Sequence, residues 1–171
     1  GKHQLLDIRS QVRFTVSGGG IKQDGMFGIA LHPELNKGTG NDFVYIAYCY
    51  DSSGFRRVRI VKYEYNRSVP SLSNPTILLR GIHGSDDHNG GRLVIGDFGT
   101  SSVHDYKLIY SVGDQGANQF ANSCDSIESQ YTPTASQLAA GNRLRYSGKI
   151  LRLNLDGSIP SDNPLINGVR S

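Results

Sequence analysis

The stretch Asp86-Asp87-His88-Asn89-Gly90-Gly91-Arg92-Leu93-Val94-Ile95-Gly96 says more about the fold than any other part of the sequence. Its apolar run, Leu93 to Ile95, has glycine close on both sides, which is typical of a short β-strand between turns. His88 therefore precedes a strand, in a loop where a rigid scaffold can present a reactive side chain. The stretch thus predicts both a strand and a candidate site.

The strand pattern around this stretch occurs twice in the chain. Four strand-like runs are separated by turn residues: 27–31, 43–50, 58–65 and 76–79. Three later runs repeat them in order. Residues 91–95 and 108–111 follow 28–32 and 45–48 by 63 positions, and residues 149–153 follow 59–63 by 90. The larger offset indicates an insertion at about 116–147. Within it, residues 132–141 predict one short helix with a Thr cap, a Pro in its first turn and a Gly after its end.

A repeated four-stranded unit is the signature of a β-propeller blade, and a β-sandwich with two similar hairpin sets is the alternative. We expect an all-β propeller, with blade one at about 21–80 and blade two at about 88–156. Two blades cannot close a ring, because a propeller typically has about four to eight blades. We therefore expect residues 1–171 to be the N-terminal part of a single propeller domain.

Composition excludes some classes of function. The net charge of +3 is spread without a basic cluster, which gives little reason to expect nucleic acid as a partner. No apolar run reaches the roughly 18 residues of a membrane helix. Gly1 is not a natural start, so a signal peptide could have been removed. Cys49 and Cys124 fit either one disulfide or two buried thiols.

A possible catalytic pair follows from the expected strand order. Asp114 comes directly after the strand at 107–113, and His88 comes before the strand at 91–95. In an antiparallel pair, the start of one strand lies beside the end of the next, so both side chains emerge at one end of the sheet. A carboxylate on one imidazole nitrogen leaves the other free to take a proton. Asp87 is the alternative partner, but neighbours in extended chain point to opposite sides, so we expect Asp87 to face the cavity.

Amide side chains are expected around this pair. Gln23 precedes the first strand of the first repeat, as His88 precedes that of the second, and Gln115, Asn118 and Gln119 follow Asp114. A His base among amides and carboxylates, without a nucleophilic Ser or Cys motif, suits abstraction of a proton from a hydroxyl group. The alternative interpretation of these residues is ordinary turns around a hydrogen-bonded histidine.

Four ordered blocks of this sequence resemble the soluble quinoprotein glucose dehydrogenases and related aldose sugar dehydrogenases. Together they span roughly 23–168 and comprise Gln23-Asp24-Gly25-Met26-Phe27-Gly28-Ile29-Ala30-Leu31-His32-Pro33, Asp87-His88-Asn89-Gly90-Gly91-Arg92-Leu93-Val94-Ile95-Gly96, Gly113-Asp114-Gln115-Gly116-Ala117-Asn118-Gln119 and Gly148-Lys149-Ile150-Leu151-Arg152-Leu153-Asn154-Leu155-Asp156-Gly157-Ser158-Ile159-Pro160.

The resemblance implies a six-bladed propeller that carries pyrroloquinoline quinone (PQQ) and Ca²⁺ and oxidises an aldose at C1 to the lactone. It implies that His88 is the general base and that Asp114 orients it. Gln23 and Asp87 would contact the sugar or the cofactor, and Gln119 would line the substrate side. Phe120 stands where an aliphatic residue is common, so the resemblance does not fix which sugar is preferred. The resemblance places the calcium ligands and the cations that bind the quinone beyond Ser171.

The same resemblance implies several partners. We expect the remaining blades to come from further chain or from a partner chain, and the 171 residues alone to be inactive. We also expect an external electron acceptor and a periplasmic or secreted location. The alternative function is a non-enzymatic propeller of the same ancestry that binds a glycan or a protein. A propeller of the lactonase type would need a set of carboxylate and Asn metal ligands, which these two blades do not show.

Overall fold

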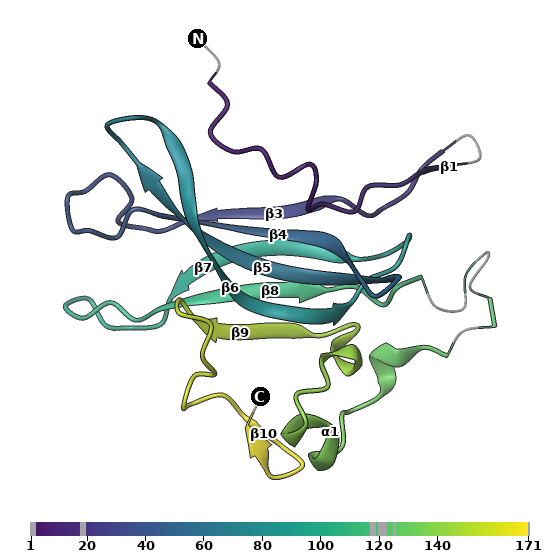
Figure 1. Cartoon of the computed structure of the whole chain (residues 1–171). Helices are drawn as coiled ribbons and strands as arrows, with labels where there is room; N and C mark the ends of the chain where they lie inside the picture. The colour runs from purple at the N-terminus through teal and green to yellow at the C-terminus, as the bar shows by residue number, and fades with distance from the viewer. Residues whose placement is uncertain (1–2, 18–19, 117–118, 120–122, 125, 171) are drawn as a thin grey trace.

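Two antiparallel sheets that pack face to face contain the main strands of the protein (Figure 1). The computed structural model describes residues 3–17, 20–116, 119, 123–124 and 126–170. The first sheet has the order β3-β4-β5-β6, with β3 at Met26–Leu31, β4 at Phe43–Ser52, β5 at Phe55–Asn66 and β6 at Ser71–His83. The second has the order β7-β8-β9, with β7 at Gly90–Asp97, β8 at Tyr106–Val112 and β9 at Ile150–Asn154. The expectation of an all-β fold is confirmed.

Local sequence explains how neighbouring strands pair. The turn between β4 and β5 consists of Ser53 and Gly54, both with positive φ, and the flanking residues Ser52 and Phe55 face each other in the ladder. Positive φ at both central residues gives the turn a twist that matches the twist of the two strands. Each sheet is therefore a meander of consecutive strands.

The main core lies between the two sheets. Its buried side chains include Tyr45 and Ile60 from the first sheet and Leu108 and Tyr110 from the second. At the β3–β7 contact the backbones approach closely, since a Cβ on Gly28 would lie 2.5 Å from the carbonyl oxygen of Gly91. This contact brings the loops that precede β3 and β7 together.

The N-terminal segment covers the opposite face of the first sheet. Leu6, Ile8 and Val12 pack there against a second cluster of apolar side chains, formed by Val44, Ile46, Tyr48, Val61 and Tyr63. In Figure 1 the purple segment crosses above β3 on this side. Both faces of the central strands are thus buried, in agreement with the nearly continuous apolar sequence of β4.

The second sheet differs from the expected four-stranded unit, because it has three strands among the described residues. After β9 the chain passes Pro160 and Pro164, which lack the N–H needed for a further ladder. It ends in a separate ribbon of β10 (Leu165–Ile166) and β11 (Val169–Arg170). A second small ribbon, β1 (Val16–Ser17) with β2 (Gly20–Ile21), precedes β3.

The insertion between β8 and β9 contains the expected short helix, with a different start. Helix α1 spans Ala135–Ala139, and its N-cap is Thr134 rather than Thr132. The Thr134 side chain accepts from the backbone of Gln137, whose side chain accepts from the Thr134 backbone, so this capping box fixes the first turn. Two 3₁₀ helices flank α1: η2 at Glu128–Gln130 and η3 at Arg143–Tyr146.

Two smaller expectations also have an outcome. Cys49 and Cys124 are both free, and Cys124 is exposed, so of the two alternatives only a buried thiol at Cys49 holds. In the described part of the chain, no helix has the length and the apolar character needed to cross a membrane.

Candidate active site

The loop before β7 is held in a fixed shape by its own side chains. The backbone N–H of Ser85 donates to the side chain of Asn89 at 2.9 Å, and the Asn89 amide donates back to the Ser85 carbonyl at 2.9 Å. The Ser85 hydroxyl accepts from the N–H of Asp87 at 2.9 Å. This closed set of hydrogen bonds holds His88 at φ +44°, a left-handed conformation that residues other than glycine rarely adopt.

His88 and Asp114 lie against each other at this end of the second sheet. Nδ1 of His88 is 3.1 Å from Oδ1 of Asp114, and 37% of each side chain is exposed. Gly113 makes this approach possible, because a Cβ at that position would overlap the His88 carbonyl oxygen. The same oxygen accepts from the N–H of Gln115 at 3.2 Å, so the loops before β7 and after β8 are joined directly.

Asp87 does not point away from His88, contrary to the expectation from extended chain. Its Oδ1 accepts from the His88 N–H at 2.9 Å and lies 3.8 Å from Nε2 of the same residue. The reason is the left-handed backbone of His88, which removes the alternation of an extended strand. The imidazole therefore has a carboxylate near each nitrogen, but only the Nδ1 contact has hydrogen-bond length.

Gln23 reaches the same site from the first sheet. Its Oε1 accepts from the His88 N–H at 3.1 Å, and its backbone carbonyl accepts from the Asn89 side chain at 2.7 Å. Gln23 is exposed, and its side-chain NH₂ bonds no described residue, so this group is available to a ligand. The structure thus brings Gln23, Asp87, His88 and Asp114 together.

The residues after Asp114 contribute less than the sequence suggested. Gln115 is buried and donates to the Gly113 carbonyl at 3.0 Å, so it serves its own turn instead of the mouth of the site. Gln119 is exposed, and its N–H donates to the Gly116 carbonyl at 3.2 Å. Asn118 and Phe120 lie outside the described residues.

Ser85 and Asn89 shape the loop, although the sequence pattern alone predicts no role for them. Asn89 is 3% exposed and makes three side-chain hydrogen bonds. The sequence feature that could have indicated this role is the position of Asn89 between His88 and two glycines, where Asn side chains commonly hydrogen-bond to nearby backbone. Its bond to Gln23 could not be predicted, because the two residues are 66 positions apart.

Two cationic side chains near the site are already paired with carboxylates. Lys22 lies 3.2 Å from Asp86, and its hydrogen bond holds the pKa of that carboxyl below its usual value. Arg56 contacts the buried Asp24 at 3.1 Å. Among the residues with described positions, no group of three or more His, Cys, Asp or Glu is arranged to hold a metal ion.

These features suit one half of a site for hydroxyl oxidation. A histidine with one nitrogen on a carboxylate and the other open can accept a proton from a bound alcohol. Gln23 and Asp87 offer a donor and an acceptor beside it, as a polyhydroxylated ligand or a quinone would need. A cofactor with several carboxylates also needs cations, and Lys22 and Arg56 are engaged with carboxylates of this chain. The described residues therefore fit the proton-accepting half of such a site.

Known proteins resemble this chain in sequence and in fold. The family model described as Glucose / Sorbosone dehydrogenase matches residues 9–171. Quinoprotein glucose dehydrogenase B of Acinetobacter calcoaceticus is 41% identical over 155 residues, which cover 87% of this chain and 30% of that protein. An uncharacterized protein of Synechocystis is 29% identical over 146 residues, which cover 85% of this chain and 31% of that protein. This chain thus spans about a third of the length of these relatives.

Solved structures agree on the fold. A glucose dehydrogenase structure matches with a TM-score of 0.59 at 20% identity, over 85% of this chain and 36% of that one. The soluble aldose sugar dehydrogenase of Escherichia coli, in its apo form, matches with a TM-score of 0.54 at 21% identity, over 91% of this chain and 40% of that one. The family model and the 41% identical relative confirm the resemblance seen in the four sequence blocks.

Proposed function

Because the chain belongs to the glucose/sorbosone dehydrogenase family, we propose that the protein which carries it oxidises an aldose sugar at C1 to the lactone. The observation that carries the proposal is the geometry of His88. Its Nδ1 lies 3.1 Å from Asp114, and Nε2 makes no hydrogen bond of normal length with any described residue. Nε2 is therefore the atom that can accept the proton of the sugar hydroxyl.

Each residue of the site has a defined task in this proposal. His88 removes the proton from the C1 hydroxyl while the hydrogen at C1 leaves as hydride, so the sugar loses two electrons and two protons in all. Asp114 keeps the remaining imidazole proton on Nδ1 and stabilises the positive ring that forms. Gln23 and Asp87 hold the sugar or the quinone beside His88, and Gln119 lines the substrate side.

The cofactor is part of the proposal. PQQ, when bound, supplies the acceptor for the hydride, and Ca²⁺ polarises its carbonyl oxygen as a Lewis acid. We propose that the calcium ligands and the cations for the quinone carboxylates lie in other blades of a six-bladed ring, from the same or a partner chain. We further propose a periplasmic or secreted location and an external electron acceptor.

The test is reconstitution of the longest chain that carries this sequence with PQQ and Ca²⁺, followed by dye reduction with glucose. We expect activity that is lost in a His88→Gln variant while quinone binding is retained. His104→Gln is the matched control, since His104 also pairs with an Asp through Nδ1 but lies beyond the other end of β7. Quinone binding without sugar oxidation would favour the non-enzymatic propeller, and absence of quinone binding would refute the proposal.

A further inference from the structure

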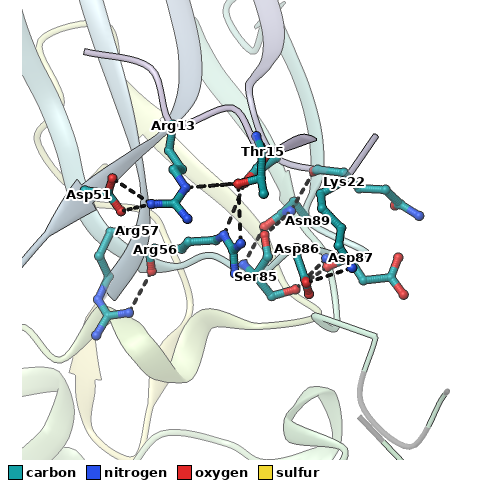
Figure 2. Close-up of polar contacts among 12 residues, drawn as sticks. Arg13, Thr15, Lys22, Asp51, Arg56, Arg57, Ser85, Asp86, Asp87 and Asn89 are labelled. Carbon is teal, nitrogen blue, oxygen red and sulfur yellow. Dashed lines mark hydrogen bonds and ion pairs between the residues drawn. The ribbon is translucent and has the colours of Figure 1, made fainter. Parts of the chain in front are cut away.

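A buried ion pair lies beside the candidate site. The side chain of Asp24 is fully buried, and its Oδ2 accepts from Nε of Arg56 at 3.1 Å. Thr15 makes two further hydrogen bonds to this carboxylate: its N–H donates to Oδ1 at 2.8 Å and its hydroxyl donates to Oδ2 at 2.7 Å. Figure 2 shows the Arg56 and Thr15 side chains meeting above the Ser85–Asn89 loop. A buried carboxylate with all these partners has one well-defined position.

The ion pair is connected to the loop from two sides. Gln23, the neighbour of Asp24 in the chain, makes three hydrogen bonds to the loop. Its N–H donates to the Asp86 carbonyl at 2.9 Å, its carbonyl accepts from the Asn89 side chain, and its Oε1 accepts from the His88 N–H. Arg56 reaches the start of the same loop, because its carbonyl accepts from the N–H of Gly84 at 3.3 Å. Both members of the pair therefore hold the chain that presents His88.

The contact with Gln23 bears on the strained part of the loop. The His88 N–H has two acceptors, Gln23 Oε1 and Asp87 Oδ1, and only the first comes from outside the loop. The left-handed backbone of His88 persists only if the surroundings hold it. Asp24 touches neither His88 nor Asp114, so an effect of Asp24 on them passes through its chain neighbour Gln23 or through its ion-pair partner Arg56.

We propose that the Asp24–Arg56 pair is a positioning device for the general base. It fixes Gln23, which fixes the backbone of His88 and thereby aims the imidazole at Asp114. The catalytic part of this inference rests on the proposed function, whereas the positioning part concerns the loop alone. Asp24 and Arg56 are positioning residues, not catalytic residues.

The test compares Asp24→Asn with Asp51→Asn in the intact protein. Asp51 pairs with Arg13 at 3.0 Å in the same network but is exposed and does not contact the loop, so it provides the matched control. For Asp24→Asn we expect amide hydrogen exchange in residues 84–90 to accelerate about tenfold, because the loop backbone around His88 is held less firmly. We also expect kcat to fall about tenfold with KM nearly unchanged. Asp51→Asn should change neither.

A double-mutant cycle separates positioning from general stability. If Asp24 acts through Gln23, adding Asp24→Asn to Gln23→Ala should lower kcat no further than Gln23→Ala alone. Arg56→Lys, which keeps the charge but lacks the Nε donor, should give a smaller effect and covers the case in which Asp24→Asn does not fold.

The outcomes distinguish the two proposals. A lower melting temperature with unchanged exchange at 84–90 and unchanged kcat in the folded variants would overturn the positioning role. Faster exchange at 84–90 in a protein that oxidises no sugar would support the positioning of His88 and refute the proposed function. Additive losses in the double-mutant cycle would also overturn the route through Gln23.

Discussion

Replacing Asp114 by Asn isolates the charge beside His88 from the shape of the site. Oδ1 of Asp114 lies 3.1 Å from His88 Nδ1 and accepts from the Gly116 N–H at 3.1 Å. An Asn oxygen at this position can accept both hydrogen bonds, so the imidazole keeps its orientation. What the variant loses is the attraction between a carboxylate and the positive imidazole that forms during proton transfer.

The size of this loss follows from the distance. At 3.1 Å, two unit charges attract by about 5 kcal/mol at an effective dielectric of about 20, and by about 1.3 kcal/mol in bulk water. Both side chains are 37% exposed, which places the value nearer the lower limit. A loss of about 2 kcal/mol corresponds to a decrease in kcat of about 30-fold.

The assay is the initial rate of dye reduction with saturating glucose, after reconstitution with PQQ and Ca²⁺. We expect Asp114→Asn to lower kcat with little change in KM, because substrate contacts are preserved. Asp97→Asn is the control, since Asp97 pairs with His104 at the far end of β7. Equal kcat in the two variants and the wild-type protein would show that the charge on Asp114 contributes nothing to proton transfer.

Three further predictions concern stability and loop geometry. Burial lowers the pKa of His32 below 6.5, and its Nδ1 accepts from the Glu34 N–H at 3.1 Å. The unfolded chain therefore binds more protons below pH 6.5, and the free energy of unfolding should fall as pH decreases below that value. Denaturant titrations from about pH 7 to 5 should show this slope, and His32→Asn should reduce it. Gly113→Ala places a Cβ on the His88 carbonyl oxygen, so kcat/KM should decrease by about tenfold or more; an unchanged value would contradict the close approach. Thr134→Ala removes the capping box of α1 and should cost about 1 kcal/mol of local stability, seen as faster amide exchange in the helix with little change in melting temperature.

Much of the fold could be read from sequence because its determinants are local. The strands of the first sheet follow one another in the chain, and their turns carry residues suited to positive φ, such as Ser53 and Gly54. The approach of His88 to Asp114 was also open to inference, since both flank adjacent antiparallel strands. The helix in the insertion was recognisable from its Thr, Pro and Gly signals, with an error of two residues at its cap.

Other features of the site depend on how the two sheets pack. The left-handed backbone of His88 turns Asp87 toward the imidazole, and periodicity does not encode this conformation. The bond from His88 to Gln23 joins residues 65 positions apart, and the partnership of Asp24 with Arg56 spans 32.

The sequence by itself therefore determined the strands, their local pairing and the residue types available for proton transfer. Only the tertiary structure decided which of these residues meet and which serve as supports. The physical reason is that alternation and turn chemistry act between close neighbours in the chain. By contrast, the contact of Gly28 on β3 with Gly91 on β7 arises only when the two sheets bury their common core.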